Sequence, residues 1–290
     1  YVRPMSRRVP AIDRVLRARV REPVRFVDLT ERLALKLAAV SEYTARVHFG
    51  IWHRAIGMPD FRRLTGVFTP LVYVELEATD VPVDPRAPFD VRGRSFLAKS
   101  LEPDGTLRHI VREGEHEVRS GAGALVARAR LVNVFTRYDA DPAKRRVTEL
   151  PPELGLGGVP SRVVDVPRMT DFVPAGRAPE LAEAAAHVWH YEQTDANRHV
   201  TGMEYLRECE AFVADALHAR GHDLRALRFA RARIVYRKPC FRGEGFRRVA
   251  WVRGEAPFVL LGGIVKAADP PGALPAASVE LTVVAQDGSS

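Results

Sequence analysis

The sequence predicts an α+β fold made of two tandem units, each with one helix followed by a short series of antiparallel strands. Two observations carry this prediction. Helical and strand-like segments follow the same order in both halves, and a proline-rich stretch separates the halves. Strands that follow one another after a single helix differ from the alternating order of parallel α/β folds. With 290 residues, 46% of them hydrophobic, the chain is long enough to bury one or two cores.

The first unit is predicted at 25–138. Its segment 41–64 has a mainly helical pattern, broken near Gly57 and Pro59. From Val72 onward apolar and polar residues alternate, which is typical of a half-buried strand. The predicted strands are 72–78, 89–101, 107–119 and 124–135.

The second unit is predicted at 181–290, with a first strand at 186–192 and a helix at 201–219 that ends before Gly221. This helix is apolar around most of its circumference, so it should be buried on several sides. A curved antiparallel sheet wrapped around a central helix would bury it in this way. The later predicted strands are 229–237, 246–253, 258–267 and 278–285.

The middle segment, 139–180, contains seven prolines and a glycine cluster near Gly157. This composition predicts a long linker with little regular structure.

Composition narrows the choice of partners and compartment. The formal charge is +8, but the basic residues are spread along the chain without interleaved aromatics, so nucleic acid is not expected as a partner. No apolar run reaches the roughly 18 residues of a membrane span. The two cysteines form no disulfide framework, which favours a reducing cytoplasm.

The most specific stretch is 190–210, in which Asp195, Asn197, His199 and Val200 precede the predicted helix and a Tyr-Leu pair begins at Tyr205. It resembles the signature of hotdog thioesterases, particularly the 4-hydroxybenzoyl-CoA thioesterase-like and acyl-ACP thioesterase families. The resemblance implies a double hotdog, with two curved sheets joined into a longer one.

A second resemblance covers 235–244, where Pro239, Gly243 and Glu244 match the end of the family's second strand. Cys240 corresponds to a cysteine of the plant-type acyl-ACP thioesterases. The acidic residue that precedes that cysteine in the family is replaced here by Pro239.

The first unit resembles a decayed copy of the motif. Glu42, Thr44 and His48 align with the second unit's motif, but Ala45 stands at the Asp position. The first unit is therefore expected to carry a degenerate site.

His48 and His53 do not have the spacing of a helical zinc pair, so no metal is expected. They are expected to line a second pocket or to pack in the core with Trp52.

The resemblance implies roles for the motif residues. Asp195 would activate water or attack the thioester directly, and burial would bring it toward a useful base strength. Asn197 would hold the water or the carboxylate, and His199 would donate to the carbonyl, shuttle a proton or orient Asp195. The oxyanion would be stabilised by backbone N–H groups at the helix N-terminus, and side chains beside them would line the substrate pocket. The predicted oxyanion residues are Val200 and Thr201, and the predicted pocket residues are Tyr205 and Cys240.

Structural roles remain open for the same residues. Asp195 and Asn197 have the spacing of a helix cap. His199 could equally pack at the start of the helix without a chemical role. Cys240 could be an ordinary residue of a strand.

The leading functional hypothesis is hydrolysis or transfer of an acyl group from acyl-CoA or an acyl carrier protein, without a cofactor. The alternatives are a dehydratase-type or other reaction of a carrier-bound chain in polyketide metabolism, and a non-catalytic acyl-binding protein. No Gly-x-Ser-x-Gly motif supports a serine hydrolase. A homodimer of double hotdogs is a further candidate assembly.

Two arginine pairs, Arg128/Arg130 and Arg231/Arg233, alternate along predicted strands, so each pair projects from one sheet face. Such a face suits docking of an acidic carrier protein or simple solvation of the sheet.

Overall fold

The structure is a computed structural model, and it describes residues 12–56, 62–63, 65–154, 156–174, 176–195, 198–253 and 258–286. No helix in these ranges is long and apolar enough to cross a membrane.

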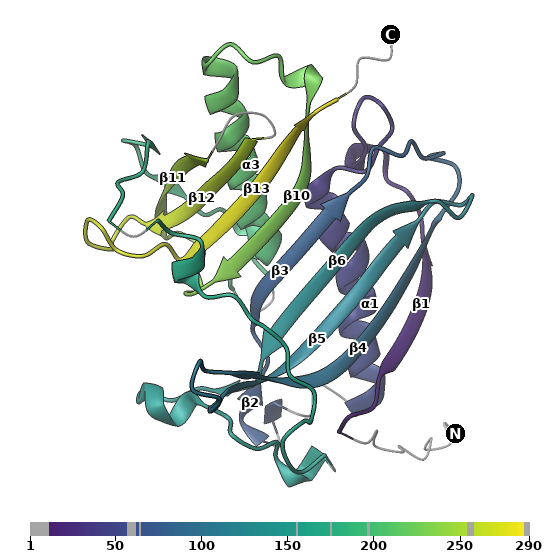
Figure 1. The fold of residues 1–290 in the computed structure, drawn as a ribbon, viewed down its shortest axis with the longest axis vertical. Coiled ribbons are helices and arrows are strands. Elements are labelled where there is room, and N and C mark those ends of the chain that lie inside the picture. The colour runs from purple at the N-terminus through teal and green to yellow at the C-terminus, as the bar shows by residue number, and fades with distance from the viewer. Residues whose placement is uncertain are drawn as a thin grey trace.

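The N-terminal unit wraps five strands around helix α1 (Figure 1). The strand order is β1-β4-β5-β6-β3, and all neighbours are antiparallel. The elements are β1 (Leu16–Glu22), α1 (Leu37–Ile56), β3 (Leu71–Ala78), β4 (Phe89–Leu101), β5 (Leu107–Arg119) and β6 (Leu125–Val134). The predicted bounds of β4 and β5 coincide with those observed, because their alternation is long and a turn closed by Gly105 separates them.

Strand β1 lies before Arg25, where the first unit was expected to begin. It pairs with β4 along its whole length, and Leu16, Ala18 and Val20 are its partly buried residues while the arginines between them are exposed. The unit therefore begins earlier than predicted, because an arginine-rich strand still presents one apolar face.

The C-terminal unit repeats this topology. In both units the first strand after the helix pairs with the fourth, and a strand before the helix pairs with the second. The elements are β8 (Leu181–Ala182), β9 (His187–Val188), α3 (Gly202–Ala219), β10 (Leu227–Tyr236), β11 (Gly245–Arg253), β12 (Phe258–Lys266) and β13 (Ala277–Ala285).

The strand predicted at 186–192 is shorter than expected. Only His187 and Val188 pair with β11, and a 3-10 turn occupies Tyr191–Gln193. The Gln193 side chain accepts a hydrogen bond from the His190 backbone N–H at 2.9 Å, which favours the turn over a continued strand.

Strands β3 and β10 pair antiparallel and join the two units into one sheet, which has eleven strands in the described part of the chain. Both central helices lie on the same side of this sheet, behind it in Figure 1. Helix α3 buries Tyr205, Leu206, Cys209, Val213 and Leu217. Arg207, Ala211 and Asp215 are exposed, so one face of the helix meets solvent and its burial is less complete than predicted.

The proline-rich linker crosses the opposite, outer face of the sheet (Figure 1). Its side chains Val166, Met169 and Phe172 pack on Tyr73 and Phe96. The remaining short elements are η1 (Phe26–Asp28), β2 (Val67–Phe68), β7 (Thr136–Arg137), η2 (Pro142–Arg145), η3 (Pro152–Leu154), η4 (Met169–Asp171) and η6 (Leu224–Ala226), with β2 and β7 paired.

Candidate functional site

The motif loop, which we define as residues 194–200, is described at 194–195 and 198–200, and a bridge between Thr194 and Val200 brings its two ends together. The Asp195 backbone N–H donates to the His199 carbonyl at 2.9 Å, and the Asp195 carboxylate accepts from the His199 backbone N–H at 3.2 Å. Arg198 adopts a positive φ of 65° between them. A non-glycine residue in this region is strained by roughly 1–3 kcal/mol, and such strain is common in functional loops.

Asp195 is exposed, so the burial expected for it is absent. The reason is that the motif loop precedes α3 at the protein surface, where Asp195 and Arg198 are both exposed, and is not covered by the helix. Asn197, the third predicted residue of the loop, lies outside the described residues.

Helix α3 begins at Gly202, with Thr201 as its N-cap residue. Asp195 therefore caps its own loop and not the helix. The Val200 N–H donates to the Cys240 carbonyl and the Thr201 N–H to the Gln193 carbonyl, each at 2.9 Å. The two predicted oxyanion donors are thus already used by these carbonyls, whereas the first N–H groups of α3 have no acceptor within the helix.

Tyr205 and Cys240 lie together beneath the motif loop, and both are buried. The Cys240 backbone N–H donates to the Tyr205 hydroxyl at 2.9 Å. Cys240 follows β10, which ends at Tyr236, so it is a loop residue rather than a strand residue. Burial raises the pKa of the Cys240 thiol, which makes it a poor nucleophile and favours a supporting role.

His199 packs edge-on against Phe241, with ring centroids 4.9 Å apart. Lys266 lies 5.5 Å from the Phe241 ring centroid and forms an ion pair of 2.8 Å with Glu244. Glu244, one of the positions that matched the family, also accepts the Phe241 N–H at 3.0 Å. The matched residues of 235–244 therefore support the loop that carries His199.

A second group of polar side chains, which the sequence did not predict, lies inside the N-terminal unit between α1 and the sheet. We call His48, Arg112, His116 and Asn133 the polar centre. The His48 ring contacts His116 at 3.2 Å and the Asn133 Oδ1 at 2.8 Å, and the Arg112 Nη2 donates to the same Oδ1 at 3.0 Å. All four residues are buried.

The electrostatics of the polar centre follow from burial. Burial lowers the pKa of Arg112 to about 9, so it remains a cation at neutral pH. Burial and the Arg112 charge lower the pKa of His116 to about 3, and burial likewise lowers that of His48. Both histidines are therefore neutral near pH 7 and leave one net positive charge inside the unit.

The first unit has Ala45 at the aspartate position of the motif, and it holds His48 in a buried polar network. Trp52 bonds to Ser95 rather than stacking on His48, at 2.6 Å between indole Nε1 and hydroxyl oxygen. The side chain of His53 lies outside the described residues. The sequence contains one indication of this group. Arg112 and His116 are separated from the apolar Ile110 by even numbers of residues on one strand, so their side chains point to the same face as Ile110, which is buried.

Glycines make room for the two histidines. A Cβ built on Gly114 would lie 2.2 Å from His48 Nδ1, and one on Gly93 would lie 2.5 Å from His116 Nδ1. Side chains longer than hydrogen are therefore excluded at both positions.

We expect Gly114→Ala to lower the free energy of unfolding by about 1–3 kcal/mol, the usual cost of overpacking a core. Urea denaturation would measure the loss. The control is Gly157→Ala, since Gly157 is exposed and its built Cβ meets nothing within 4 Å. Equal stability of the Gly114 variant and wild type would contradict the described packing of His48.

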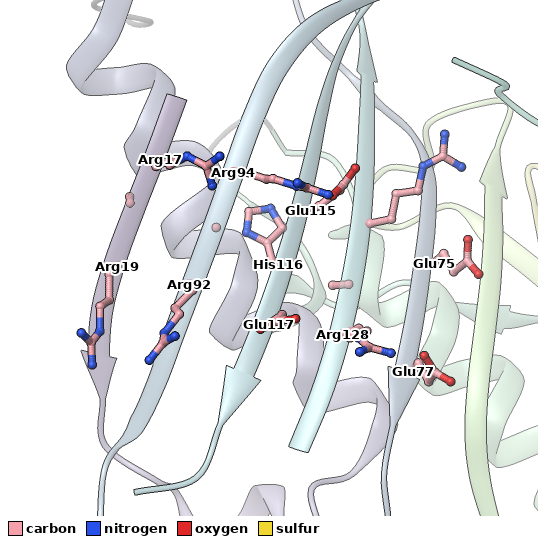
Figure 2. Close-up of a pocket in the computed structure, with 14 residues that line it drawn as sticks. Arg17, Arg19, Glu75, Glu77, Arg92, Arg94, Glu115, His116, Glu117 and Arg128 are labelled. Carbon is pink, nitrogen blue, oxygen red and sulfur yellow. The ribbon is translucent and has the colours of Figure 1, made fainter. Parts of the chain in front are cut away.

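The outer face of the sheet over the N-terminal unit carries a cavity of about 940 Å³ lined mostly by charged side chains (Figure 2). The neighbouring strands β1 and β4 both present arginines, and from β4 through β5 and β6 to β3 arginines and glutamates alternate from strand to strand. Arg130 pairs with Glu113, Arg231 with Glu75, and Arg233 with Glu280. Three of the four arginines considered for carrier docking thus have carboxylate partners, which favours a solvated sheet face for them.

No protein-family model matches the chain, and no curated protein matches it. Solved structures do. A Lactobacillus plantarum protein provisionally named an oleoyl thioesterase is 14% identical, with a TM-score of 0.66 over 94% of this chain and 97% of that one. An acyl-ACP thioesterase from Bacteroides thetaiotaomicron is 12% identical, with a TM-score of 0.62 over 92% and 97%.

Rv0216 from Mycobacterium tuberculosis, described as having a double hotdog fold, is 11% identical and gives a TM-score of 0.51 over 96% of this chain and 97% of that one. This chain has a double hotdog fold. The α+β prediction is confirmed. In this double hotdog protein the motif loop belongs to the C-terminal unit and the polar centre to the N-terminal unit.

Proposed function

We propose that this double hotdog protein hydrolyses an acyl thioester, or transfers its acyl group, where the motif loop, the first turn of α3 and Cys240 meet. The observation that carries the proposal is the chain of hydrogen bonds from Val200 to Cys240 to Tyr205. It holds residues from both matched segments, 190–210 and 235–244, in one place. Two of the similar structures bear thioesterase names, which supports the same reaction class.

In this proposal a water molecule attacks the thioester carbonyl carbon while Asp195 accepts its proton. The developing oxyanion is stabilised by N–H groups of the first α3 turn and by the positive end of the helix dipole. Collapse of the tetrahedral intermediate breaks the carbon–sulfur bond, and the leaving thiolate takes up the proton. His199 orients the carbonyl or the carboxylate.

Cations and aromatic rings around the motif loop suit a phosphorylated handle such as coenzyme A or a carrier's phosphopantetheine arm. Arg198 lies in the loop itself, Lys266 lies against Phe241, and the Arg242 guanidinium is 5.6 Å from the Tyr191 ring centroid. Phosphate oxygens bind favourably to such cations.

The direct test is thiol release from a panel of acyl-CoA and acyl-carrier substrates, with mass spectrometry of the products. Release of free acid supports hydrolysis. Loss of water from an intact thioester would instead support dehydratase-type chemistry, and acyl binding without turnover would support a non-catalytic protein.

The edge of the outer face suggests a separate prediction about the carrier. Arg17 on β1 lies opposite Arg94 on β4 (Figure 2). Arg94 pairs with Glu115, and Arg19 and Arg92 pair with Asp90, whereas Arg17 has no carboxylate partner among the described residues. Arg17 is therefore the cation at this edge that can attract an acidic surface. We expect kcat/KM for a carrier-bound acyl group to fall several-fold as salt rises to ~0.15 M. The substitution Arg17→Glu should have the same effect at low salt.

The control is a short, carrier-free thioester, such as an N-acetylcysteamine ester, whose hydrolysis should respond far less to salt. The same salt response for both substrates would argue against carrier steering.

A further inference from the structure

Arg112 is fully buried, yet no carboxylate among the described residues pairs with it. Its Nη2 donates to Asn133, while Nε and Nη1 have no hydrogen-bond partner within the described part of the chain. Burying a cation without a counter-ion is strongly unfavourable. An anion bound to the two unpaired guanidinium nitrogens would neutralise this buried charge.

The surroundings of Arg112 offset only part of this cost. Its Cζ lies 5.2 Å from the Phe49 ring centroid and 5.9 Å from that of Trp52, which are favourable cation–π distances. His48 and His116 are neutral and contribute no negative charge. Glu113, next in sequence, projects from the opposite face of β5 and pairs with Arg130.

The polar centre lies close to the start of α3. Leu71 is the Cα partner of Asn133 across β3 and β6, so their side chains share the inner face of the sheet. A Cβ built on Gly202, the first residue of α3, would lie 3.3 Å from the Leu71 Cδ2. Leu71 therefore contacts the first turn of α3 and is also paired with Asn133, which bonds to Arg112.

From this geometry we propose that Arg112, held in place by the Asn133 Oδ1, binds a carboxylate at the far end of the acyl chain. The substrate class is then the half-thioester of a dicarboxylic acid. This inference rests on the proposed function for the position of the thioester. A carboxylate would accept from the two unpaired guanidinium nitrogens and neutralise the buried charge.

The test compares adipoyl-CoA with hexanoyl-CoA, which have the same chain length but differ in the terminal carboxylate. We expect wild type to prefer adipoyl-CoA, and Arg112→Met to lower kcat/KM for it by about 100-fold while hexanoyl-CoA hydrolysis is unchanged or improved. Methionine removes the buried charge and can pack on Phe49 and Trp52, so the fold should persist. The control Arg46→Met removes an exposed arginine of α1, which pairs with Glu22, and should change neither rate selectively.

Equal hydrolysis of both substrates by wild type, or equal losses of both in Arg112→Met, would overturn the proposal while leaving thioester hydrolysis in place. Hydrolysis of neither substrate would count against the proposed function instead.

Calorimetry then decides the carboxylate site by itself, and does so even if the variant fails to fold. Wild type should bind monomethyl adipate, which has one carboxylate, and not dimethyl adipate, which has none. Equal binding of the two esters, or binding of neither, would overturn the site.

Discussion

Asp195→Asn is expected to lower thioester turnover by about 100-fold or more, the usual scale for loss of a positioned base. Asparagine cannot take a proton from water or attack the carbonyl. It can still accept the His199 backbone N–H that the Asp195 carboxylate accepts at 3.2 Å, so the motif loop should keep its shape. Steady-state hydrolysis of the best acyl-CoA substrate measures the effect, and circular dichroism checks the fold.

The matched control is Asp223→Asn. Asp223 is also an exposed aspartate in the C-terminal unit, and it accepts the Arg225 backbone N–H at 3.0 Å. Its substitution removes one charge and preserves one cap, far from the motif loop in sequence. A near-native rate in the Asp195 variant would show that Asp195 is not the catalytic group.

The second large effect concerns acid stability. The free energy of unfolding should fall steeply as pH drops below 6.5, because His48 and His116 are buried in the neutral form. In the unfolded chain these rings take up protons near pH 6.5. In the folded chain burial lowers the pKa of His116 to about 3, so the unfolded state binds more protons across this window. His116 by itself accounts for on the order of 5 kcal/mol between these limits.

The measurement is urea denaturation between pH 4.5 and 7. Against wild type, His116→Gln should flatten the slope by ~1.4 kcal/mol per pH unit, one proton's worth, while glutamine can still bond to His48. Glu210 acts in the opposite sense: burial raises its pKa to about 8, so its contribution is lost as pH rises toward that value. The comparison of variant with wild type cancels this contribution.

His218→Gln, which removes an exposed histidine from α3, serves as the control and should leave the slope as in wild type. An unchanged slope in the His116 variant would mean that His116 is not held neutral in the folded protein.

The sequence by itself determined the order of elements and their approximate bounds. Strands β4 and β5 and helix α3 were predictable because each has a long, unbroken periodicity and a defined turn or glycine at its end. The motif at Asp195, His199 and Val200 was visible because its residues are close in sequence and stand in one register.

Only the tertiary structure decided how exposed these residues are. Asp195 was expected to be buried, and its exposure follows from where the motif loop lies relative to α3. The Val200 and Thr201 N–H groups were expected to be donors for an oxyanion. Their carbonyl partners, on Cys240 and Gln193, are brought to them by the folding of separate segments.

The polar centre could not be found by reading along the chain. His48, Arg112, His116 and Asn133 come from one helix and two strands, and on β5 Arg112 and His116 stand among other charged residues that do not join the centre. Local periodicity is set by neighbours three or four residues apart in a helix and two apart in a strand. Contacts across a sheet and onto its helix depend on pairing register, which only the folded chain fixes, and this is why a unit without the motif still holds a buried cation.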